Sequence, residues 1–374
     1  MKFQIQKNIL QQVLQSVISA VPNKATFQIL NNFSFRLEGN LLEVAATDLD
    51  LGIRMSVEVE GELDGAIILP ARRLFDLVKN LVDPSITKIS FDLDDYKVTI
   101  RWSERGYSSL AGFDAADFPQ FPEVNDGTIF QISAAELAFL VDKTKFAVST
   151  DVTRVALNGA FLEAKDNKIS MVATDGHRLG RASVEHENVS LESGVIVPPK
   201  VLNHVLSNVS SESNVEIRIS QTHILFLSEN VQVISKLIEG PYPKYENVIP
   251  LTFSRKIQAN TLELLNKISC VISMASARTH QIRLQINESS LELSASDPDV
   301  GGFSSEELAI SHEGEGSFSI GFNGVYLSNI LKMCSSENVE MKMTSSTGAC
   351  IIEPVGDSMN FSFLLMPLRL VDDN

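Results

Sequence analysis

The chain has 374 residues, which is too long for one ordinary hydrophobic core and predicts two or three domains. Hydrophobic residues make up 44% and charged residues 21% of the sequence, proportions typical of a globular protein rather than a disordered one. The net charge of −16 excludes a protein that grips nucleic acid with its whole surface, but it leaves open one that surrounds DNA with a locally basic lining.

The first predicted element is a helix near the amino terminus. Asn8 and Gln11 have the spacing of a capping box, in which a polar side chain accepts from the first turn and a Gln or Glu reaches back, and a helical apolar pattern follows. A segment rich in β-branched residues then precedes a turn at Pro70, and a second amphipathic helix follows the turn. The alternating segments 88–93 and 97–102 have the period of half-buried strands.

The same series of signals recurs twice more along the chain. Capping boxes at Ser133 with Glu136 and at Asn260 with Glu263 repeat the first signal at intervals of about 125 residues. Further landmarks keep step with them: Asp48, Asp175 and Asp297 in similar turns, the turns at Pro70, Pro198 and Asn323, and the alternating segments 215–220, 223–228, 339–344 and 349–354. Four landmarks in register are hard to produce by chance, so the sequence predicts three copies of one module.

Each copy combines two helices with many short strands, which predicts an α+β fold. We expect three domains, at residues 1–124, 125–252 and 253–374, joined by short linkers. The period is far longer than the ~20–50 residues of a solenoid repeat, so each copy can hold its own core. Three similar domains in a row make a curved arm, and an arm with complementary ends tends to close into a ring.

Motifs spread from one end of the chain to the other resemble a known family. They are PARR at 70–73, DAADFP at 114–119, ATDGHRLG at 173–180, YPKYENVIP at 242–250, GFN at 321–323 and MPLRL at 366–370. With them the sequence resembles the bacterial DNA polymerase III β subunits, the β sliding clamps. The resemblance implies a non-catalytic processivity factor of DNA replication that needs no cofactor and no metal.

The resemblance also implies an assembly and a set of partners. Six similar domains of a head-to-tail homodimer would form a ring, with helices lining a central hole and antiparallel sheets outside. The ring would encircle double-stranded DNA without sequence preference. It would tether the DNA polymerase III catalytic subunit, the clamp loader, and other polymerases and repair proteins that carry a peptide motif of the type Gln-Leu-x-Leu-Phe.

A rough geometric estimate favours the dimer. Twelve helices with ~9 Å between their axes leave a hole at least ~24 Å wide, whereas the six helices of one chain would leave well under ~10 Å. The proposed lining helices carry nine basic and four acidic residues, although ordinary solvated helix faces are the plain alternative. The DNA-facing candidates are Lys24, Arg72, Arg73, Lys79, Lys143 and Lys200. Such contacts position a protein on DNA and weaken with salt.

One asymmetry among the copies predicts a binding site. Only the middle copy has Gly-His-Arg in its turn, and only the third copy ends in an apolar strand. The resemblance implies that these pieces meet in a peptide-binding groove. Its apolar cup would be Leu157, Thr174, Leu179, Pro243, Val248, Leu364 and Met366; its rim Gly176, His177 and Arg178; and a neighbouring subsite Arg154, Asn323, Tyr326, Pro367, Leu368 and Arg369. Each residue taken alone is as well explained as an ordinary core or solvent-exposed residue. The prediction therefore depends on the match of the whole set to the family.

The sequence departs from the family pattern beside this groove. Ala156 stands where some relatives carry an aromatic residue and Asn247 where some carry Arg, which predicts a shallower or less cationic groove. Family chains commonly end at the equivalent of Leu370, whereas Val371–Asn374 follows here with two carboxylates. We hypothesise that these carboxylates repel acidic peptides, so that deleting 371–374 tightens peptide binding; the alternative is a disordered end without consequence.

The two ends of the arm are expected to form the dimer contact. By resemblance, the contact joins Tyr107, Ser108 and Leu110 of the first domain to Ser273 and Met274 of the third. The stretch around these residues is less apolar than such an interface usually is.

Two other classes of function compete with this reading. An enzyme is disfavoured because no GxSxG elbow, P-loop, HExxH or paired CxxC is present. A monomeric β-rich module that binds protein or carbohydrate would not need basic residues on its helices and would elute as a monomer. The three cysteines are too few and too dispersed for a disulfide framework or zinc knuckle and are expected to be buried thiols. Without an apolar run of ~18 residues or a secretory signal at MKFQIQKN, the expected location is the cytoplasm.

Overall fold

The computed structural model describes residues 1–125, 127–187, 189–356 and 360–370. It consists of two compact units, each treated separately below: unit 1 contains Met1–Leu137 and Lys200–Leu237, and unit 2 contains Ala138–Pro199 and Ile238–Asn374. The middle repeat therefore contributes strands to both units. The tail Val371–Asn374, on which one hypothesis rests, lies outside the described residues.

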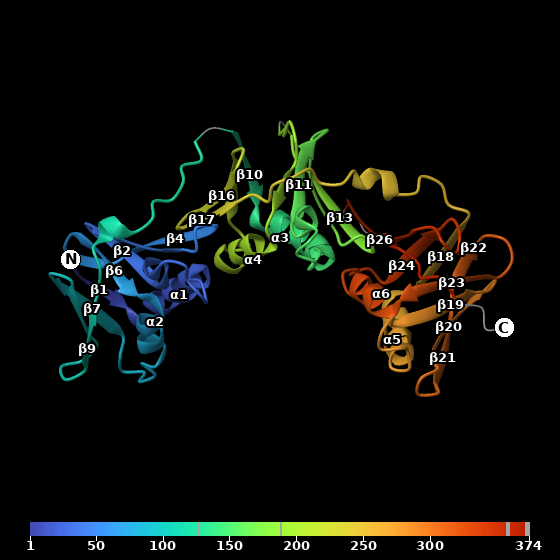
Figure 1. Cartoon of the computed structure of the whole chain (residues 1–374), viewed down its shortest axis with the longest axis horizontal. Coiled ribbons are helices and arrows are strands. Elements are labelled where there is room, and N and C mark those ends of the chain that lie inside the picture. The colour runs from blue at the N-terminus through green and yellow to red at the C-terminus, as the bar shows by residue number, and fades with distance from the viewer. Residues whose placement is uncertain (126, 188, 357–359, 371–374) are drawn as a thin grey trace. The chain divides into compact units, whose positions relative to one another are not determined.

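Unit 1 contains two antiparallel sheets (Figure 1). A five-stranded sheet has the order β5-β1-β7-β8-β9, with β1 (Lys2–Gln6), β5 (Glu60–Leu63), β7 (Lys88–Asp94), β8 (Lys97–Arg101) and β9 (Tyr107–Ala111). An eight-stranded sheet has the order β10-β15-β16-β17-β4-β3-β2-β6, with β2 (Asn32–Glu38), β3 (Leu41–Thr47), β4 (Leu51–Glu58), β6 (Gly65–Pro70), β10 (Thr128–Ser133), β15 (Asn214–Ile219), β16 (His223–Ser228) and β17 (Val231–Lys236). The pairing of β17 with β4 joins the first repeat to the second in one continuous sheet.

Unit 2 repeats this plan with the second and third repeats. Its nine-stranded sheet has the order β14-β11-β12-β13-β26-β25-β24-β18-β22, with β11 (Ala160–Lys165), β12 (Lys168–Thr174), β13 (Arg178–Glu185), β14 (Val195–Val197), β18 (Arg255–Asn260), β22 (Ser311–Glu313), β24 (Asn338–Met343), β25 (Cys350–Pro354) and β26 (Asn360–Leu365). A four-stranded sheet has the order β21-β20-β19-β23, with β19 (Gln281–Ile286), β20 (Ser290–Asp297), β21 (Gly302–Ala309) and β23 (Phe318–Asn323). Here β13 pairs with β26, which again carries one sheet across two repeats.

The helices pack one apolar face onto these sheets. They are α1 (Lys7–Val17), α2 (Ala71–Lys79), α3 (Ala134–Thr144), α4 (Pro199–Asn208), α5 (Thr261–Ile272) and α6 (Gly324–Leu331). In α1 the fully buried side chains Leu10, Leu14 and Val17 recur at helical spacing, and each such burial stabilises the fold by about 1.5–3 kcal/mol. The predicted α+β class is confirmed, as is the alternating burial of the predicted strands, for example in β15 and β24.

Two of the three predicted helix starts are confirmed and one is wrong. Ser133 and Glu136 form a reciprocal capping box, and the Asn260 side chain accepts from the Glu263 N–H. In the first repeat the helix begins at Lys7 after an N-cap at Gln6, so Asn8 lies inside the helix and caps nothing. The Lys7 N–H donates to the Thr87 carbonyl, as the first helical N–H of α3 and α5 does to a loop carbonyl. This backbone contact fixes the start of α1 without a capping side chain.

This difference predicts unequal effects of two matched substitutions. Ser133→Ala removes a capping oxygen and is expected to lower the free energy of unfolding by about 1 kcal/mol. Asn8→Ala, the control, should change it by less than about 0.5 kcal/mol because Asn8 is not a cap. Urea unfolding followed by circular dichroism measures both values, and equal losses in the two variants would contradict the assignment.

The cysteine prediction is correct for two residues and wrong for the third. Cys334 and Cys350 are buried, and burial raises the pKa of the Cys350 thiol. Cys270 on α5 is exposed. Among the described residues, no helix is both long enough and apolar enough to cross a membrane.

Candidate functional site

The predicted rim of the groove is a tight turn between β12 and β13, in unit 2. The Asp175 carboxylate accepts from the backbone N–H groups of His177 (2.9 Å) and Arg178 (3.0 Å). The Thr174 hydroxyl donates to the Arg178 carbonyl (2.7 Å) and accepts from the Gly176 N–H (3.1 Å). Gly176 has a φ of 89°, a conformation that side-chain-bearing residues rarely adopt. The Gly-His-Arg stretch is therefore held by the side chains of Thr174 and Asp175, which directly precede it.

Arg178 is the most firmly held side chain of the rim. Its Nε donates to the second Asp175 carboxylate oxygen (3.0 Å), and both side chains are nearly buried. Its guanidinium lies 4.3 Å from the ring centre of Tyr326 and 5.5 Å from that of Phe146, which are cation–π contacts. Its Nη1 is buried without a hydrogen-bond partner among the described residues.

Two residues predicted for the apolar cup, Leu179 and Leu364, meet where β13 pairs with β26. Leu179 lies opposite Leu364, and the Met366 N–H donates to the His177 carbonyl (2.8 Å), so the end of the chain is tied to the turn. Leu179 and Leu364 belong to a buried cluster that also contains Tyr245. Met366 stays 37% exposed above this cluster. A cup with a buried floor and an exposed apolar edge can take the side chain of a partner.

The other wall is the segment that contains Pro243 and Val248. Tyr242 stacks on Phe161, with ring centres 4.8 Å apart and an interplanar angle of 9°. The Tyr245 hydroxyl donates to the buried Glu163 carboxylate (2.5 Å), and burial together with this carboxylate raises the pKa of Tyr245. Both tyrosines are thus anchored in the core, and they leave Pro243 and Val248 exposed.

The predicted subsite lies around the start of α6. The Asn323 side chain caps α6 by accepting from the Tyr326 N–H (3.1 Å) and donates to the Thr279 carbonyl (3.2 Å). Leu368 bridges to Gly321, and Gln281 donates to the Arg369 carbonyl (3.0 Å). The His177 and Tyr326 rings are 6.5 Å apart, which connects the subsite to the rim.

Arg154 contacts the turn through a hydrogen bond to its backbone. Its Nη1 donates to the Asp175 carbonyl (3.2 Å). It precedes the short 3-10 helix Val155–Leu157, in which Val155 is exposed and Leu157 half-buried. Ala156 is half-buried and Asn247 exposed, so neither adds a large or charged side chain to the groove.

Sequence reasoning missed the residues that hold this site from beneath. Tyr242, Tyr245 and Phe161 anchor one wall, and Asp175 fixes the turn and Arg178. Asp175 stands in a turn that recurs in all three repeats, and Tyr242 and Tyr245 stand in the motif at 242–250, but neither pattern indicates which side chains are anchored in the core. Aromatic residues in an irregular segment give no period from which burial can be read.

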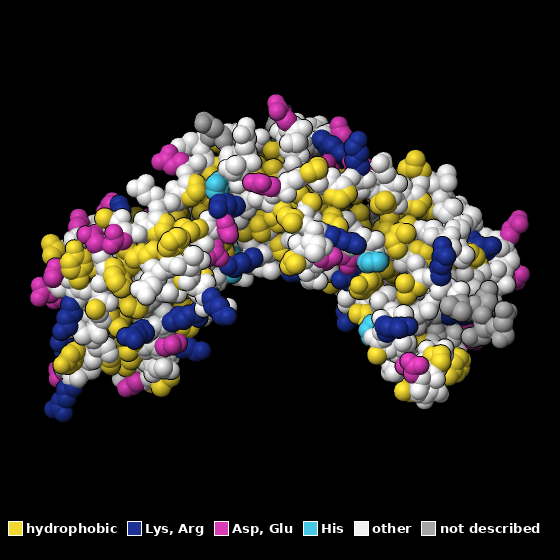
Figure 2. All heavy atoms as spheres, in the orientation of Figure 1, with side chains coloured by type: hydrophobic (Ala, Val, Ile, Leu, Met, Phe, Trp, Pro, Cys, Tyr) yellow, Lys and Arg dark blue, Asp and Glu magenta, His cyan; other side chains and the backbone are white. Residues whose placement is uncertain are grey.

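The DNA-facing candidates differ in how freely they are held. Lys24, Arg72, Arg73, Lys79 and Lys200 are exposed, and Figure 2 shows basic side chains over the part of unit 1 where Figure 1 labels α1 and α2. Arg72 donates to the Asn23 side chain (2.8 Å), and Lys200 pairs with Asp48 (2.7 Å).

Lys143 in unit 2 is held differently, because its ammonium donates to the Met333 carbonyl and lies 4.5 Å from the Phe361 ring centre. We expect Lys143 to hold α3 against the third repeat more than to contact phosphate.

The predicted dimer residues lie on an edge strand of unit 1 and at the end of a helix of unit 2. Tyr107, Ser108 and Leu110 are on β9, the last strand of the five-stranded sheet of unit 1. Ser273 and Met274 directly follow α5 in unit 2, and Met274 is 44% exposed. Two further exposed apolar residues, Val300 and Phe303, lie beside them, since both Met274 and Val300 approach Gly302. Sequence reasoning missed this pair because the exposure of an apolar residue cannot be read from its type.

Comparisons with known proteins agree with this architecture over the whole chain. Models of the DNA polymerase III beta subunit match residues 1–122 as its N-terminal domain, 131–244 as its central domain and 246–369 as its C-terminal domain. The beta sliding clamps of Vibrio cholerae and Rickettsia bellii are 30% and 31% identical to the chain, over 99% of the chain and 100% of each relative.

Solved structures are similar to the same extent. The DNA polymerase III subunit beta of Pseudomonas aeruginosa superposes with a TM-score of 0.91 at 28% identity. A sliding clamp of Bartonella birtlesii bound to griselimycin superposes with a TM-score of 0.92 at 31% identity. Both alignments cover 99% of this chain and 100% of the other. The chain belongs to the DNA polymerase III β-subunit family, the β sliding clamps.

Proposed function

We propose that two copies of this chain close head to tail into a ring that encircles duplex DNA and tethers DNA polymerase III and other proteins to it. The observation that carries the proposal is the end-to-end match to three clamp domains, combined with sheets that continue from repeat to repeat. As a sliding clamp, the protein is a processivity factor and not an enzyme.

Charge on the helices of unit 1 supports the proposed DNA contact. α1, α2 and α4 together carry five lysines and arginines and one aspartate, in a chain of net charge −16. Burial, aided by the charge of Lys200, lowers the pKa of His204 on α4, so this histidine stays neutral at pH 7. We propose Lys24, Arg72, Arg73, Lys79 and Lys200 as phosphate contacts, which hold DNA loosely without reading its sequence.

Two edge strands support the proposed ring closure. β9 ends the five-stranded sheet of unit 1, and β21 ends the four-stranded sheet of unit 2. Edge strands carry backbone groups that can pair with another chain. We propose that β9 of one copy pairs with β21 of the next, with Tyr107 and Leu110 against Met274 and Phe303.

The groove of unit 2 is the proposed site for partner peptides. A cup that takes one or two apolar side chains beside cationic groups suits a short motif of the type Gln-Leu-x-Leu-Phe. The contact is small, so we expect micromolar affinity and easy exchange of partners. The proposed partners are the polymerase catalytic subunit, the clamp loader, and other polymerases and repair proteins.

The decisive experiment tests encirclement by its topology. We expect the protein, after loading by a bacterial clamp loader, to stay on nicked circular DNA through gel filtration at high salt. Cutting the same DNA once should release it, because a ring slides off an end whereas a gripping protein does not. Equal retention on circular and cut DNA would contradict the proposal. A monomeric binding module, the competing reading, would show no dependence on DNA topology.

A further inference from the structure

The first repeat contains a second copy of the groove-forming turn, in unit 1. The Asp48 carboxylate accepts from the N–H groups of Asp50 (3.1 Å) and Leu51 (2.7 Å), as Asp175 does in unit 2. The Thr47 hydroxyl donates to the Leu51 carbonyl (2.9 Å) and accepts from the Leu49 N–H (2.9 Å), as Thr174 does. The turns at 47–51 and 174–178 therefore share these four hydrogen bonds at equivalent positions.

The surroundings of the turn are also duplicated. Gly52 pairs with Ile234 on β17, as Leu179 pairs with Leu364 on β26. The Lys236 N–H donates to the Asp50 carbonyl (2.9 Å), as the Met366 N–H does to that of His177. The segment FPQFPEV at 118–124 crosses this site, as YPKYENV at 242–248 crosses the groove of unit 2.

A cavity of about 330 Å³ lies at this point, at the lower end of the range for small ligand pockets. Leu49, Phe121 and Ile234 provide apolar walls, and Asp50 and Lys236 lie at the edge. We call this cavity the unit 1 cup. The Phe121 ring packs directly onto Gly52, where a Cβ atom would lie 2.9 Å from the ring. The ring therefore takes the place that the Leu179 side chain holds in the groove.

The backbone conformation of Leu49 indicates that the unit 1 cup has a function of its own. It has a φ of 77°, at the position where the groove has Gly176. A leucine in this conformation costs roughly 1 kcal/mol of folding free energy. Burial of the side chain would offset this cost, but Leu49 is 45% exposed and lines the cavity. An exposed apolar side chain held in a strained conformation is expected where a ligand contacts it.

We propose that the unit 1 cup is a second peptide-docking site, which takes one aliphatic or aromatic side chain of a peptide segment without net charge. The choice of ligand follows from the edge of the cup. The groove has His177 beside Arg154 and Arg178, whereas the cup has Asp50 and Lys236, which form an exposed ion pair of 3.0 Å. Burial, together with the charge of Lys236, lowers the pKa of the nearby His223, so it adds no charge at pH 7. An edge with balanced charges gains nothing from an acidic peptide.

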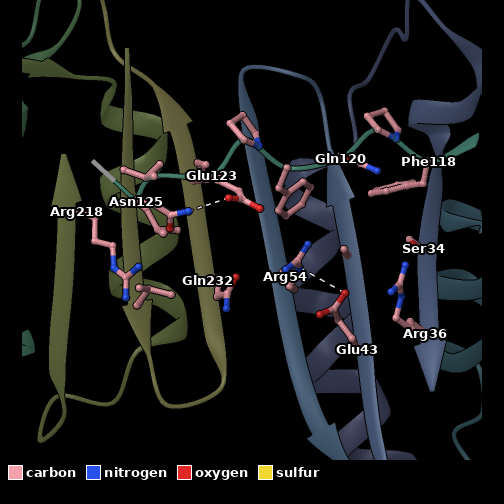
Figure 3. A pocket seen from close by; sticks show the side chains of 18 of the residues that line it. Ser34, Arg36, Glu43, Arg54, Phe118, Gln120, Glu123, Asn125, Arg218 and Gln232 are labelled. Carbon is pink, nitrogen blue, oxygen red and sulfur yellow. Dashed lines mark hydrogen bonds and ion pairs between the residues drawn. The ribbon is translucent and has the colours of Figure 1, made fainter. Parts of the chain in front are cut away.

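The rest of the peptide has room in an adjoining cleft of about 810 Å³ on the same face of the sheet, drawn in Figure 3. The cup and this cleft share the Phe121 and Ile234 side chains. In the cleft, Arg54 pairs with Glu43 (3.4 Å) and Arg218 with Glu216 (2.7 Å). Figure 3 shows Arg54, Arg218 and Gln232 extending from the strands below the segment that carries Glu123. Their charges are balanced here too, and the amide and guanidinium groups can bond to a peptide backbone.

The test is an isothermal calorimetric titration of the full-length protein with the uncharged peptide acetyl-Gln-Leu-Ala-Leu-Phe-amide. The proposal rests on the proposed function in that both sites take apolar peptides of one class. We expect two sites per chain, the weaker being the unit 1 cup. Leu49→Gly should weaken only the second site, by about tenfold, because it removes the apolar wall. The same change relieves the strained backbone, so the unfolding midpoint should stay equal or rise.

Controls separate this proposal from the groove. Leu63→Gly, an exposed leucine of unit 1 outside the cup, should leave both sites unchanged. Leu157→Ala with Met366→Ala should remove the tight site and leave the weak one. A photo-crosslinking version of the peptide should label 47–52 or 118–124 in addition to the groove. One site per chain at peptide concentrations up to about 1 mM, with no label in unit 1, would overturn the second site while leaving the groove intact.

Discussion

Replacing Phe303 by aspartate is expected to convert the proposed dimer into monomers of 41.1 kDa and to abolish retention on circular DNA. Phe303 is 68% exposed on the edge strand β21, beside Met274 and Val300. These side chains form an exposed apolar patch in a strongly acidic chain, and such a patch marks a contact surface. Burying an aspartate there without a partner would cost several kcal/mol, enough to open an interface of ordinary size. Sedimentation equilibrium measures the association directly.

Three outcomes identify the interface. Leu251→Asp, which changes an almost fully exposed leucine elsewhere in unit 2, should leave the dimer intact. Tyr107→Asp on β9 should dissociate the proposed dimer as Phe303→Asp does, because the two surfaces would meet in a head-to-tail ring. The circular dichroism spectrum of each variant should match that of the parent, since these side chains are exposed. A Phe303→Asp protein that remains dimeric would contradict the assignment of β21 to the interface.

The repeats could be predicted from the sequence because each depends on local chemistry that leaves a fixed spacing. The capping boxes at Ser133 and Asn260 are real, and so is the recurring turn at Asp48 and Asp175. The predicted start of α1 lies two residues too far along the chain. The N-cap position is Gln6, whose side chain forms no capping hydrogen bond, whereas Asn8 is a residue type that often caps helices. Helices α1, α3 and α5 in fact begin at the equally spaced positions 7, 134 and 261.

The groove residues could be named only through their resemblance to a family, and the structure adds how they are held. The stacking of Arg178 on Tyr326 joins residues far apart in the sequence, and no periodicity connects them. Lys143 shows a different limit of sequence-based prediction. As a basic residue on a proposed lining helix, it was predicted to contact DNA. Its ammonium is in fact held by the Met333 carbonyl and the Phe361 ring. Such pairings depend on tertiary geometry, which a residue pattern does not contain.

The second large effect is expected from the double substitution Leu157→Ala and Met366→Ala in the groove. Leu157 is half-buried and Met366 is exposed, whereas Leu179 and Leu364 are buried, so truncating Leu157 and Met366 should remove apolar contact with a peptide and leave the core packed. Truncating two such anchors should weaken binding of a fluorescein-labelled Gln-Leu-x-Leu-Phe peptide by about 100-fold. Fluorescence anisotropy measures the affinity, and Val152→Ala, at a residue 81% exposed in the same unit, is the matched control.

The same variant separates peptide binding from ring formation, because the groove contributes no residue to the proposed ring contacts. The double variant should still dimerise in sedimentation equilibrium, although a clamp loader that docks in the same groove should load it less well. DNA synthesis by the cognate polymerase should nevertheless lose its processivity, since the ring no longer holds the enzyme. If instead the variant bound peptide normally, the cup would lie elsewhere. If it bound no peptide and also failed to dimerise, its defect would be one of folding, and a lowered unfolding midpoint would reveal this. Loss of peptide binding with an intact ring is the only combination that assigns the groove its function.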